Sequence, residues 1–377
     1  MKLLVVFGTR PEVIKLAPVI DEARRRADAI ELTLCSTGQH REMLDQAMAV
    51  FGLRADVELK VMQERQGLAG LTARLLQGLD EVMIAHRPDV VVVQGDTTSA
   101  FAAGLAAFYR QIPVAHVEAG LRTGDLSSPF PEELNRVLLG RLARWHFAPT
   151  ARAAQALRDE GVAPERCVVT GNTVVDAIRL IRERWAQAGA AGDEQPFPGR
   201  ELVLVTAHRR ENQGQALRNI CAAVHQLCLQ YPELGFVFPV HLSPHVRDIV
   251  FAELGRDTPN LLLCDPVDFE SNLRLQSRCR LVVTDSGGIQ EEAPSFGVPV
   301  VVTREHTERS EGIEAGFATL AGTSTEAIVR AARTWLDQAD ARRALASRPN
   351  PYGDGHAARR MVELLLGDPE LRRHHAA

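Results

Sequence analysis

Residues 281–292 read Leu281-Val282-Val283-Thr284-Asp285-Ser286-Gly287-Gly288-Ile289-Gln290-Glu291-Glu292. The first four residues are apolar or β-branched and predict a buried strand, and the last four predict the start of a helix. Between them, two glycines let the backbone approach a ligand, and the free N–H groups of a helix start bind phosphate oxygens. This unit predicts a parallel sheet with a phosphate-binding loop at its carboxyl edge.

The same alternation extends along the chain in both directions. Short apolar runs are separated by longer amphipathic stretches, which is typical of parallel sheets covered by helices on both faces. The predicted strands form two sets: Leu3–Phe7, Leu32–Cys35, Val90–Val93, Val114–Val117, Trp145–Phe147 and Cys167–Val169, then Leu202–Val205, Phe236–Val240, Leu261–Cys264, Leu281–Thr284 and Val298–Val302. A chain of 377 residues is long enough for two domains. We therefore predict an α/β fold with two Rossmann-like sheets.

Turn-forming residues place the boundary between the two sheets. Thr170-Gly171-Asn172 interrupts the pattern, and an Ala-, Gly- and Pro-rich stretch at 186–199 precedes the second sheet. A last helix, expected from 357 to 366, follows the turn-rich residues 350–355. These breaks predict an N-terminal domain over 1–171 and a C-terminal domain over 172–356.

Composition excludes several classes of protein. The net charge of −5 gives no general attraction to nucleic acid, and 45% hydrophobic with 24% charged residues is the globular norm. The six cysteines are scattered without a CxxC pair, and a proline separates His241 from His245, so neither a metal nor a redox motif is predicted. Free thiols fit a cytoplasmic protein. The first apolar stretch is too short for a signal peptide core and no run reaches membrane-spanning length, so neither a signal peptide nor a membrane span is expected.

Polar residues that follow the strands are the candidates for a site, because ligands of open parallel sheets bind beyond the carboxyl ends of the strands. Gly8-Thr9-Arg10-Pro11-Glu12 follows the first strand and places Arg10 at a helix entrance, with Lys15 one turn further on. The chain has three lysines against forty arginines, which favours a functional Lys15 over a solvated surface lysine. The loop is not GxGxxG, and no dinucleotide fingerprint occurs elsewhere, so no cofactor is predicted.

Three carboxylates fall around the same predicted edge of the first sheet. Asp96 and Glu118 follow two strands, and Glu132 opens a helix after Pro131. Asp96 alone is explained equally well as a helix N-cap, and Glu132 as a stabiliser of the helix dipole. Together the three suit proton transfer, since carboxylates in one site shift each other's pKa.

The second half of the chain offers groups for an anion. His208-Arg209-Arg210 follows a predicted strand and suits an anion site, although a hydrogen-bonded loop histidine is the alternative. Ser286 adds a hydroxyl to the glycine loop, and Glu292 is placed to bind a ribose diol. Arg309 adds positive charge to the same site.

At these residues the sequence resembles a known family, the non-hydrolysing UDP-N-acetylglucosamine 2-epimerases. The resemblance covers nearly the whole chain in order and rests on these segments: Gly8–Glu12, His116–Thr123, Pro131–Arg136, His208–Glu211, Thr284–Pro294 and Asn350–Gly355. It implies a GT-B fold, in which two Rossmann-like domains face a central cleft and the final helix, within 357–377, packs back on the first domain. It also implies a homodimer that acts in cell-surface polysaccharide synthesis.

The resemblance further implies interconversion of UDP-GlcNAc and UDP-ManNAc. C2 of the sugar is not next to a carbonyl, so inversion needs either transient oxidation with NAD or loss of a leaving group. The absence of an NAD fingerprint favours the second route. In the family, a base removes the C2 proton while UDP leaves in an anti elimination. The resulting 2-acetamidoglucal is reprotonated from the opposite face, and UDP adds back.

Site roles carry over residue by residue. Asp96, Glu118 and Glu132 resemble the family's acid/base set, with no assignment of a carboxylate to either face of the sugar. Lys15 and His208 resemble further active-site residues that help the diphosphate leave. The positions that resemble the contacts to UDP are Arg10, Ser286, Gly287, Gly288, Glu292 and Arg309.

Some members of the family bind a second UDP-GlcNAc as an activator. The positions that resemble this site are Gln39, Arg65, Arg210 and His241, with Glu42 where a glutamine often stands. The sequence departs from the family at three places. Val267 and Asn272 stand where residues including an aromatic cradle uracil, and Ser310 replaces a proline.

These departures bear on the exact base and sugar more than on the reaction class. Three other functions stay open beside UDP-GlcNAc epimerisation. One is a 2-epimerase for a related UDP-2-acetamido sugar, such as a diacetamido uronate. Another is a hydrolysing epimerase that releases free ManNAc. The third is a GT-B glycosyltransferase, which would transfer the sugar to an acceptor without exchange at C2.

Overall fold

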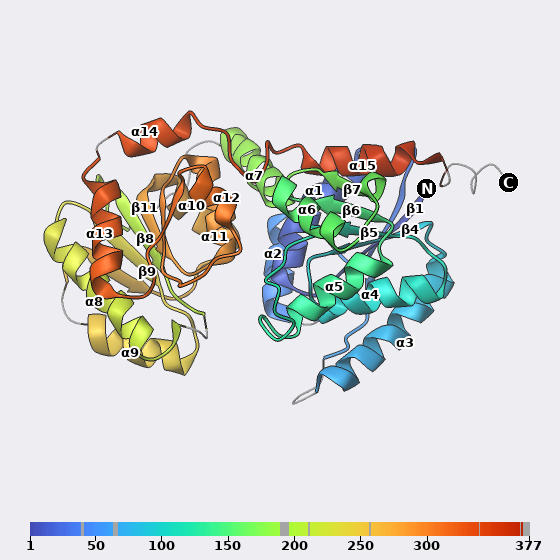
Figure 1. Cartoon of the computed structure of the whole chain (residues 1–377), viewed down its shortest axis with the longest axis horizontal. Helices are drawn as coiled ribbons and strands as arrows, with labels where there is room; N and C mark the ends of the chain where they lie inside the picture. The colour runs from blue at the N-terminus through green and yellow to red at the C-terminus, as the bar shows by residue number, and fades with distance from the viewer. Residues whose placement is uncertain are drawn as a thin grey trace. The chain divides into compact units, whose positions relative to one another are not determined.

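The computed structural model describes residues 1–38, 41–62, 67–188, 196–209, 212–255, 258–338, 340–369 and 371. The chain divides into two compact units, Met1–Leu180 with Tyr352–Ala377, and Ile181–Pro351. The outgoing crossing lies inside one helix, α7 (Thr173–Ala188). Each unit is built around its own parallel sheet (Figure 1).

The first unit holds a seven-stranded sheet of order β3-β2-β1-β4-β5-β6-β7 within the described residues. All of its strand pairs are parallel, so the carboxyl ends of the strands meet at one edge. The strands are β1 (Lys2–Phe7), β2 (Glu31–Ser36), β3 (Val57–Glu58), β4 (Val90–Gln94), β5 (Val114–Val117), β6 (Trp145–Ala148) and β7 (Cys167–Val169).

Helices cover both faces of this sheet, as the uninterrupted apolar strands predict. Leu3, Val5 and Phe7 of β1 face α1 (Arg10–Arg24), α2 (Arg41–Val50) and α15 (Ala357–Gly367). Leu4 and Val6 point to the other face, toward α3 (Leu68–His86), α4 (Thr98–Tyr109) and α5 (Glu132–Leu142). The C-terminal helix α15 therefore belongs to the core of the first unit, where it lies along α1 (Figure 1). The remaining helical segments of this unit are α6 (Ala151–Asp159) and the 3-10 turn Pro164–Arg166.

The second unit repeats the architecture with six parallel strands in the order β10-β9-β8-β11-β12-β13, among the residues described. The strands are β8 (Leu202–Thr206), β9 (Gly235–Pro239), β10 (Leu261–Cys264), β11 (Cys279–Thr284), β12 (Val300–Val302) and β13 (Ala318–Leu320). One face packs on α8 (Gln215–Gln230), α9 (Pro244–Leu254) and α13 (Thr325–Leu336). The remaining helices are α10 (Phe269–Arg278), α11 (Gly287–Glu292), the 3-10 turn Ala293–Phe296, α12 (Ser310–Glu314) and α14 (Ala341–Ala346).

The eleven predicted strands are confirmed, and two short ones were missed. β3 and β13 are edge strands of two and three residues, and all of these except Ala318 are half-buried or exposed, so no apolar run marks them. β12 begins at Val300, two residues later than predicted, because Pro299 has no N–H to give to the ladder. The last helix begins at Ala357, as predicted.

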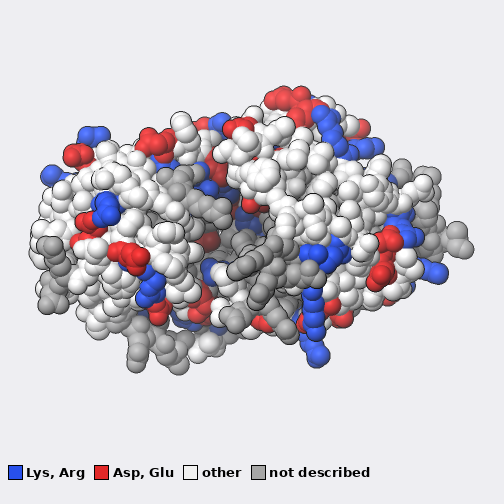
Figure 2. Space-filling model, turned by 90° about the horizontal axis from the view of Figure 1, so that it is seen from below, with Lys and Arg blue, Asp and Glu red and all other residues white. Residues whose placement is uncertain are grey.

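The surface carries both signs of charge. Figure 2 shows basic and acidic side chains interspersed over the visible face. Within the described residues, no helix combines the length and the apolar character that crossing a membrane requires. The six cysteines are free, and five of them are buried, including Cys35.

Asp176 of α7 makes the docking of α15 sensitive to pH. Its buried carboxylate accepts hydrogen bonds from the Ala357 and Ala358 N–H groups, at 3.2 and 2.9 Å, at the start of α15. Burial raises the pKa of the Asp176 carboxyl to about 6, and the two backbone hydrogen bonds only partly oppose this. The folded protein therefore holds this proton more tightly than the unfolded chain does, so this contribution to stability is lost as the pH rises from about 4 through about 6.

We expect Asp176→Asn to gain stability relative to wild type as the pH rises. Between pH 4 and pH 7 the difference in unfolding free energy should move by about 2 kcal/mol in favour of the variant, since the amide carries no buried charge. Urea unfolding of both proteins at the two pH values measures this. A difference that is independent of pH would contradict the assignment.

Candidate functional site

Glu118 is a buried candidate in the first unit whose two carboxylate oxygens both have partners. It directly follows β5, its backbone is in the left-handed region with φ of 62°, and it is 9% exposed. Its Oε1 is ion-paired with Lys15 Nζ of α1 and accepts from Asn172 Nδ2 at 3.2 Å. Its Oε2 accepts from Gln94 Nε2 at the end of β4. Three donors from three parts of the chain therefore hold one carboxylate. A left-handed conformation is uncommon in a non-glycine residue and costs free energy, so the contacts around Glu118 must hold it.

Asp96 follows the neighbouring strand β4 and is anchored by α5. Arg136 Nε donates to Asp96 Oδ2 at 2.7 Å, and Asn135 Nδ2 donates to the Asp96 carbonyl at 2.8 Å. The N-cap of α4 is Thr97, whose Oγ1 accepts from Ala100 N at 3.0 Å. The alternative explanation of Asp96 as the cap of this helix is therefore wrong.

Glu133, and not Glu132, is the buried member of the acidic pair that opens α5. Glu133 is 1% exposed, accepts from Arg136 Nη1 at 3.0 Å and receives the N–H groups of Thr123 and Gly124. Glu132 is half-buried, and no hydrogen bond or ion pair links it to Asp96 or Glu118 within the described part of the chain. The structure thus places Asp96 and Glu118 just after the carboxyl ends of the neighbouring strands β4 and β5. Glu132 lies at the start of α5, the helix whose Asn135 and Arg136 bind Asp96.

The loop after β1 is organised by Glu12, which the sequence reasoning did not single out. Its Oε2 accepts from the Gly8 and Thr9 N–H groups at 2.9 and 2.7 Å, and its Oε1 accepts from Thr97 Oγ1. Burial raises the pKa of the Glu12 carboxyl, and these hydrogen bonds oppose the rise. Arg10 begins α1 from this loop, as predicted.

His116 of β5 supports the loop that carries Asp96. Its Nε2 lies 2.7 Å from the Gly95 carbonyl oxygen, and burial lowers the pKa of the ring to about 4. The imidazole is therefore neutral near pH 7, and the contact with a carbonyl requires the proton to be on Nε2. Gly95 N also donates to the Val117 carbonyl at 3.0 Å, so both the N–H and the carbonyl group of Gly95 are hydrogen-bonded to β5.

In the second unit, His208 is held by Asp285. The His208 and Arg209 N–H groups donate to Asp285 Oδ2 at 3.0 and 2.9 Å, and Asn212 Nδ2 donates to the same oxygen at 3.0 Å. His208 Nδ1 lies 3.1 Å from Asp285 Oδ1. Although burial raises the pKa of the Asp285 carboxyl, its hydrogen bond with His208 and these contacts lower it overall. A buried carboxylate on Nδ1 orients the ring and leaves Nε2 for a ligand.

The guanidinium of Arg309 packs against the glycine loop. Ser286 is the N-cap of α11, and a Cβ on Gly287 would lie 2.9 Å from Arg309 Cζ, so only glycine leaves room for this side chain. Arg309 Nε donates to Glu291 Oε1 at 3.1 Å, and Arg309 is also paired with Glu308. Burial raises the pKa of the Glu308 carboxyl, but Arg309 and Arg304 lower it to about 2. The predicted group of Ser286, Gly287, Gly288 and Arg309 is therefore one local cluster.

Glu292 closes this cluster from the far end of α11. Its Oε2 accepts from Gln276 Nε2 at 2.6 Å, and a Cβ on Gly288 would lie 3.2 Å from its Oε1. Gln276 also donates to Asn272 Oδ1 at 2.6 Å. Asn272, one of the departures from the family pattern, thus belongs to the same hydrogen-bonded group as Glu292, and half-buried Val267 precedes its helix.

Of the residues predicted for an activator site, only His241 is described. Gln39, Arg65 and Arg210 lie outside the described residues, as does the side chain of Glu42. The His241 ring stacks on His208, with ring centroids 6.1 Å apart. His241 therefore lies beside the residue predicted to help the leaving group.

The sequence reasoning missed the partners of the predicted residues. Gln94, Asn172, Arg136 and Asp285 each hold a predicted group by a side-chain contact. Position after a strand was a usable signal for Gln94 and Asp285. Asn172 also follows a predicted strand, but Thr170-Gly171-Asn172 was interpreted only as a domain boundary. Arg136 carries no such signal, because it lies within a helix.

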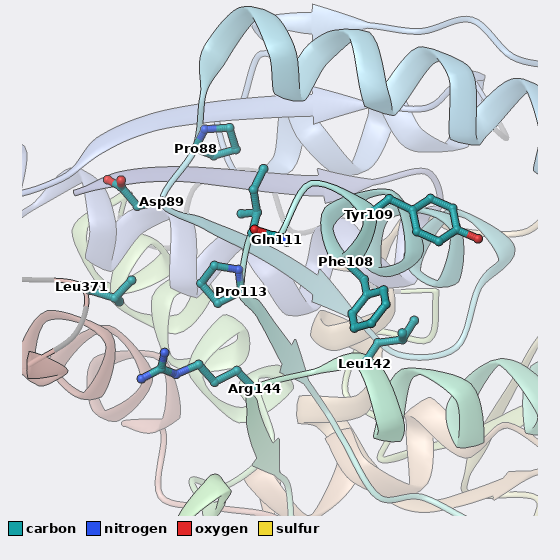
Figure 3. A pocket seen from close by; sticks show the side chains of 10 residues that line it. Pro88, Asp89, Phe108, Tyr109, Gln111, Pro113, Leu142, Arg144 and Leu371 are labelled. Carbon is teal, nitrogen blue, oxygen red and sulfur yellow. The ribbon is translucent and has the colours of Figure 1, made fainter. Parts of the chain in front are cut away.

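A hollow of about 810 Å³ lies at the other edge of the first sheet. Pro88, Asp89 and Pro113 line it just before β4 and β5, and Arg144 lines it just before β6, as Figure 3 shows. The exposed rings of Phe108 and Tyr109 complete one side. None of the predicted site residues lines this hollow, so it is not the predicted site.

The chain is similar to known proteins over nearly its whole length. The family model described as UDP-N-acetylglucosamine 2-epimerase matches residues 22–366. The UDP-N-acetylglucosamine 2-epimerase of Escherichia coli (strain K12) is 46% identical over 371 residues, which cover 97% of this chain and 98% of that protein.

Solved structures give the same result. The crystal structure of UDP-GlcNAc 2-epimerase from Neisseria meningitidis bound to UDP-GlcNAc is 42% identical, with a TM-score of 0.90 over 98% of this chain and 100% of that one. The Methanocaldococcus jannaschii UDP-GlcNAc 2-epimerase in complex with UDP-GlcNAc and UDP is 30% identical, with a TM-score of 0.79 over 97% and 99%. With two Rossmann-like, GT-B-type units and this similarity over nearly its whole length, the chain belongs to the UDP-N-acetylglucosamine 2-epimerase family.

Proposed function

We propose that the protein interconverts UDP-GlcNAc and UDP-ManNAc by anti elimination and re-addition of UDP, without net hydrolysis. The observation that carries the mechanism is Glu118, a buried carboxylate held by Lys15, Gln94 and Asn172 at the carboxyl edge of the first sheet. A fixed carboxylate next to a second, anchored one suits removal and return of a proton. Relatives that bind UDP-GlcNAc support the choice of substrate.

The reaction balances without an external oxidant. A carboxylate of the acid/base set takes the proton from C2, the electron pair of that bond forms the C1–C2 double bond, and the C1–O bond breaks with its electrons on UDP. Reprotonation of the glucal at C2 from the opposite face leaves C1 electron-deficient, and a diphosphate oxygen of UDP adds there. Asp96, Glu118 and Glu132 form the proposed set, with the assignment to the two faces left open.

The second unit supplies the grip on the leaving group. Arg309 beside the Ser286-Gly287-Gly288 loop provides positive charge, and backbone N–H groups near glycines approach phosphate oxygens closely. His208, oriented by Asp285, is proposed to assist departure of the diphosphate, together with Lys15 and Arg10. Glu292 is proposed to bind the ribose. UDP must stay bound after the C1–O bond breaks, because it returns to the same sugar.

The ion pair of Lys15 with Glu118 adds a second function for this lysine. A lysine that contacts the proposed base is placed to compensate the charge of that carboxylate as well as that of the diphosphate.

We further propose that the protein acts as a homodimer in the cytoplasm and that a second UDP-GlcNAc binds as an activator, with His241 as its described contact.

Incubation of the purified protein with UDP-GlcNAc in D2O tests the mechanism. We expect deuterium at C2 and a mixture of the two epimers, without added NAD, read by NMR. Absence of solvent deuterium at C2 would sink the elimination mechanism. Accumulation of free ManNAc would indicate a hydrolysing epimerase. Transfer to an added acceptor without C2 exchange would indicate a glycosyltransferase, and turnover only of a diacetamido uronate would change the substrate.

A further inference from the structure

Asn172, which precedes α7, lies beside the segment by which the chain returns to the first unit. The backbone N–H of Asn172 donates to the Tyr352 carbonyl at 2.7 Å. A Cβ on the neighbouring Gly171 would lie 3.3 Å from Gly353 Cα, so the two strands of chain touch through glycines. Nearby, Arg360 Nη1 donates to the Thr170 carbonyl at 3.0 Å. The outgoing and returning segments are therefore tied together within the first unit.

Every polar group of Asn172 is used. Its side chain is buried, its Oδ1 accepts from Val174 N at 3.0 Å in the first turn of α7, and its Nδ2 donates to Glu118 Oε1 at 3.2 Å. The hydrogen bond from Val174 N to Oδ1 fixes the orientation of the amide. A flipped amide would present its NH2 group, a donor, to the Val174 N–H. The helix cap thus fixes the direction in which Nδ2 meets Glu118.

The other contacts of Glu118 show what the Asn172 amide contributes to its position. Lys15 supplies the opposite charge on Oε1, and Gln94 binds Oε2 from β4. The ionisable groups on the elements around Glu118 include Lys15 and Glu12 of α1, His116 of β5 itself and His146 of β6, and, beyond β4, Asp96 with its partner Arg136 of α5. Two neutral amides on opposite oxygens fix the plane of the carboxylate without adding charge.

We propose that Asn172 is a positioning residue for the reaction, which holds the Glu118 carboxylate in the plane required for proton transfer at C2. The inference rests on the proposed function of Glu118 as an acid/base group. It adds a residue that acts through Glu118 and is itself bound to the segment by which the chain returns to the first unit.

Asn172→Asp separates this role from the helix cap. A carboxylate still accepts from Val174 N and suits a helix start, so the melting temperature should stay within a few degrees of wild type. In place of a donor, however, Glu118 would face a second carboxylate, which opposes its ionisation. We expect kcat near pH 7 to fall about 10-fold or more, and the acid limb of the pH profile of kcat/KM to move up by about one pH unit.

Asn172→Ser is the companion variant. The hydroxyl retains the cap but removes the donor without adding charge, so kcat should fall while KM for UDP-GlcNAc stays within about twofold and the acid limb moves less. Asn219→Asp is the matched control, since it makes the same charge change in the second unit, where Asn219 donates to the Thr323 carbonyl. It should keep the wild-type pH profile.

The inference is overturned if both Asn172 variants keep wild-type kcat, or if kcat falls in Asn172→Asp while the acid limb does not move. The second result would mean that Asn172 is merely structural. These outcomes are distinct from failure of the proposed function, which would appear as missing C2 deuterium in the wild-type protein.

Discussion

Glu118→Gln is expected to lower turnover of UDP-GlcNAc about 100-fold or more, while UDP still binds. The amide cannot accept the C2 proton. It also disrupts the geometry, because Lys15, Gln94 and Asn172 all direct donors at the present carboxylate, and the new amide nitrogen would face one of them. Initial rates of UDP-ManNAc formation and the rate of deuterium entry at C2 should fall together, since both need the same proton transfer.

Binding of UDP, measured by calorimetry, separates this effect from unfolding. Most of the proposed UDP contacts lie in the second unit, and the variant leaves Arg10 and Lys15 of the first unit in place, so the dissociation constant of UDP should stay within about threefold of wild type. Turnover at the wild-type rate would remove Glu118 from the acid/base set. Loss of UDP binding together with a large drop in melting temperature would assign the residue to folding instead.

Asp96→Asn is expected to lower turnover to a similar extent, again about 100-fold or more, with UDP binding preserved. The physical setting differs from that of Glu118, because Asp96 is bound to the guanidinium of Arg136, and the loop that carries it is fixed by Asn135 and His116. The variant keeps the shape of the side chain but loses its charge. Arg136 keeps Glu133 as a partner, so its buried charge is not left alone.

Glu160→Gln is the matched control for both carboxylate variants. Glu160 accepts from Arg122 at 2.7 and 2.9 Å in the same unit, and the side-chain exposures of this pair, 12% and 27%, resemble the 9% and 24% of Arg136 and Asp96. It removes an equivalent ion pair outside the proposed site and should leave turnover within about twofold. If Glu160→Gln lowered turnover as much as Asp96→Asn does, general loss of stability and not proton transfer would explain both.

Most of the fold could be predicted because buried parallel strands leave a strong local trace. Val90–Val93 and Leu281–Thr284 are apolar on both faces, so each run could be recognised without knowledge of its neighbours. β3 and β13 could not be recognised, because an edge strand pairs on one side only. Part of each strand is exposed to solvent, so the sequence shows no continuous apolar run there.

The candidate site was predictable in part for a related reason. In a parallel sheet the carboxyl ends of the strands share one edge, so Asp96 and Glu118 had to lie near each other once β4 and β5 were neighbours. Their precise surroundings could not be derived, because Lys15, Asn172 and Arg136 reach them across 103, 54 and 40 residues of chain.

The sequence by itself determined the two parallel sheets, the strand-end residues that form the candidate site and, through its motifs, the family. Local periodicity and short motifs are sufficient for these features, since each is written within a few consecutive residues. Only the tertiary structure decided that Thr97 caps α4 and Asp96 pairs with Arg136, that Asp285 binds His208, and that Asn172 donates to Glu118. Such pairings depend on which buried donors and acceptors meet when distant segments pack, and burial requires each of them to find a partner.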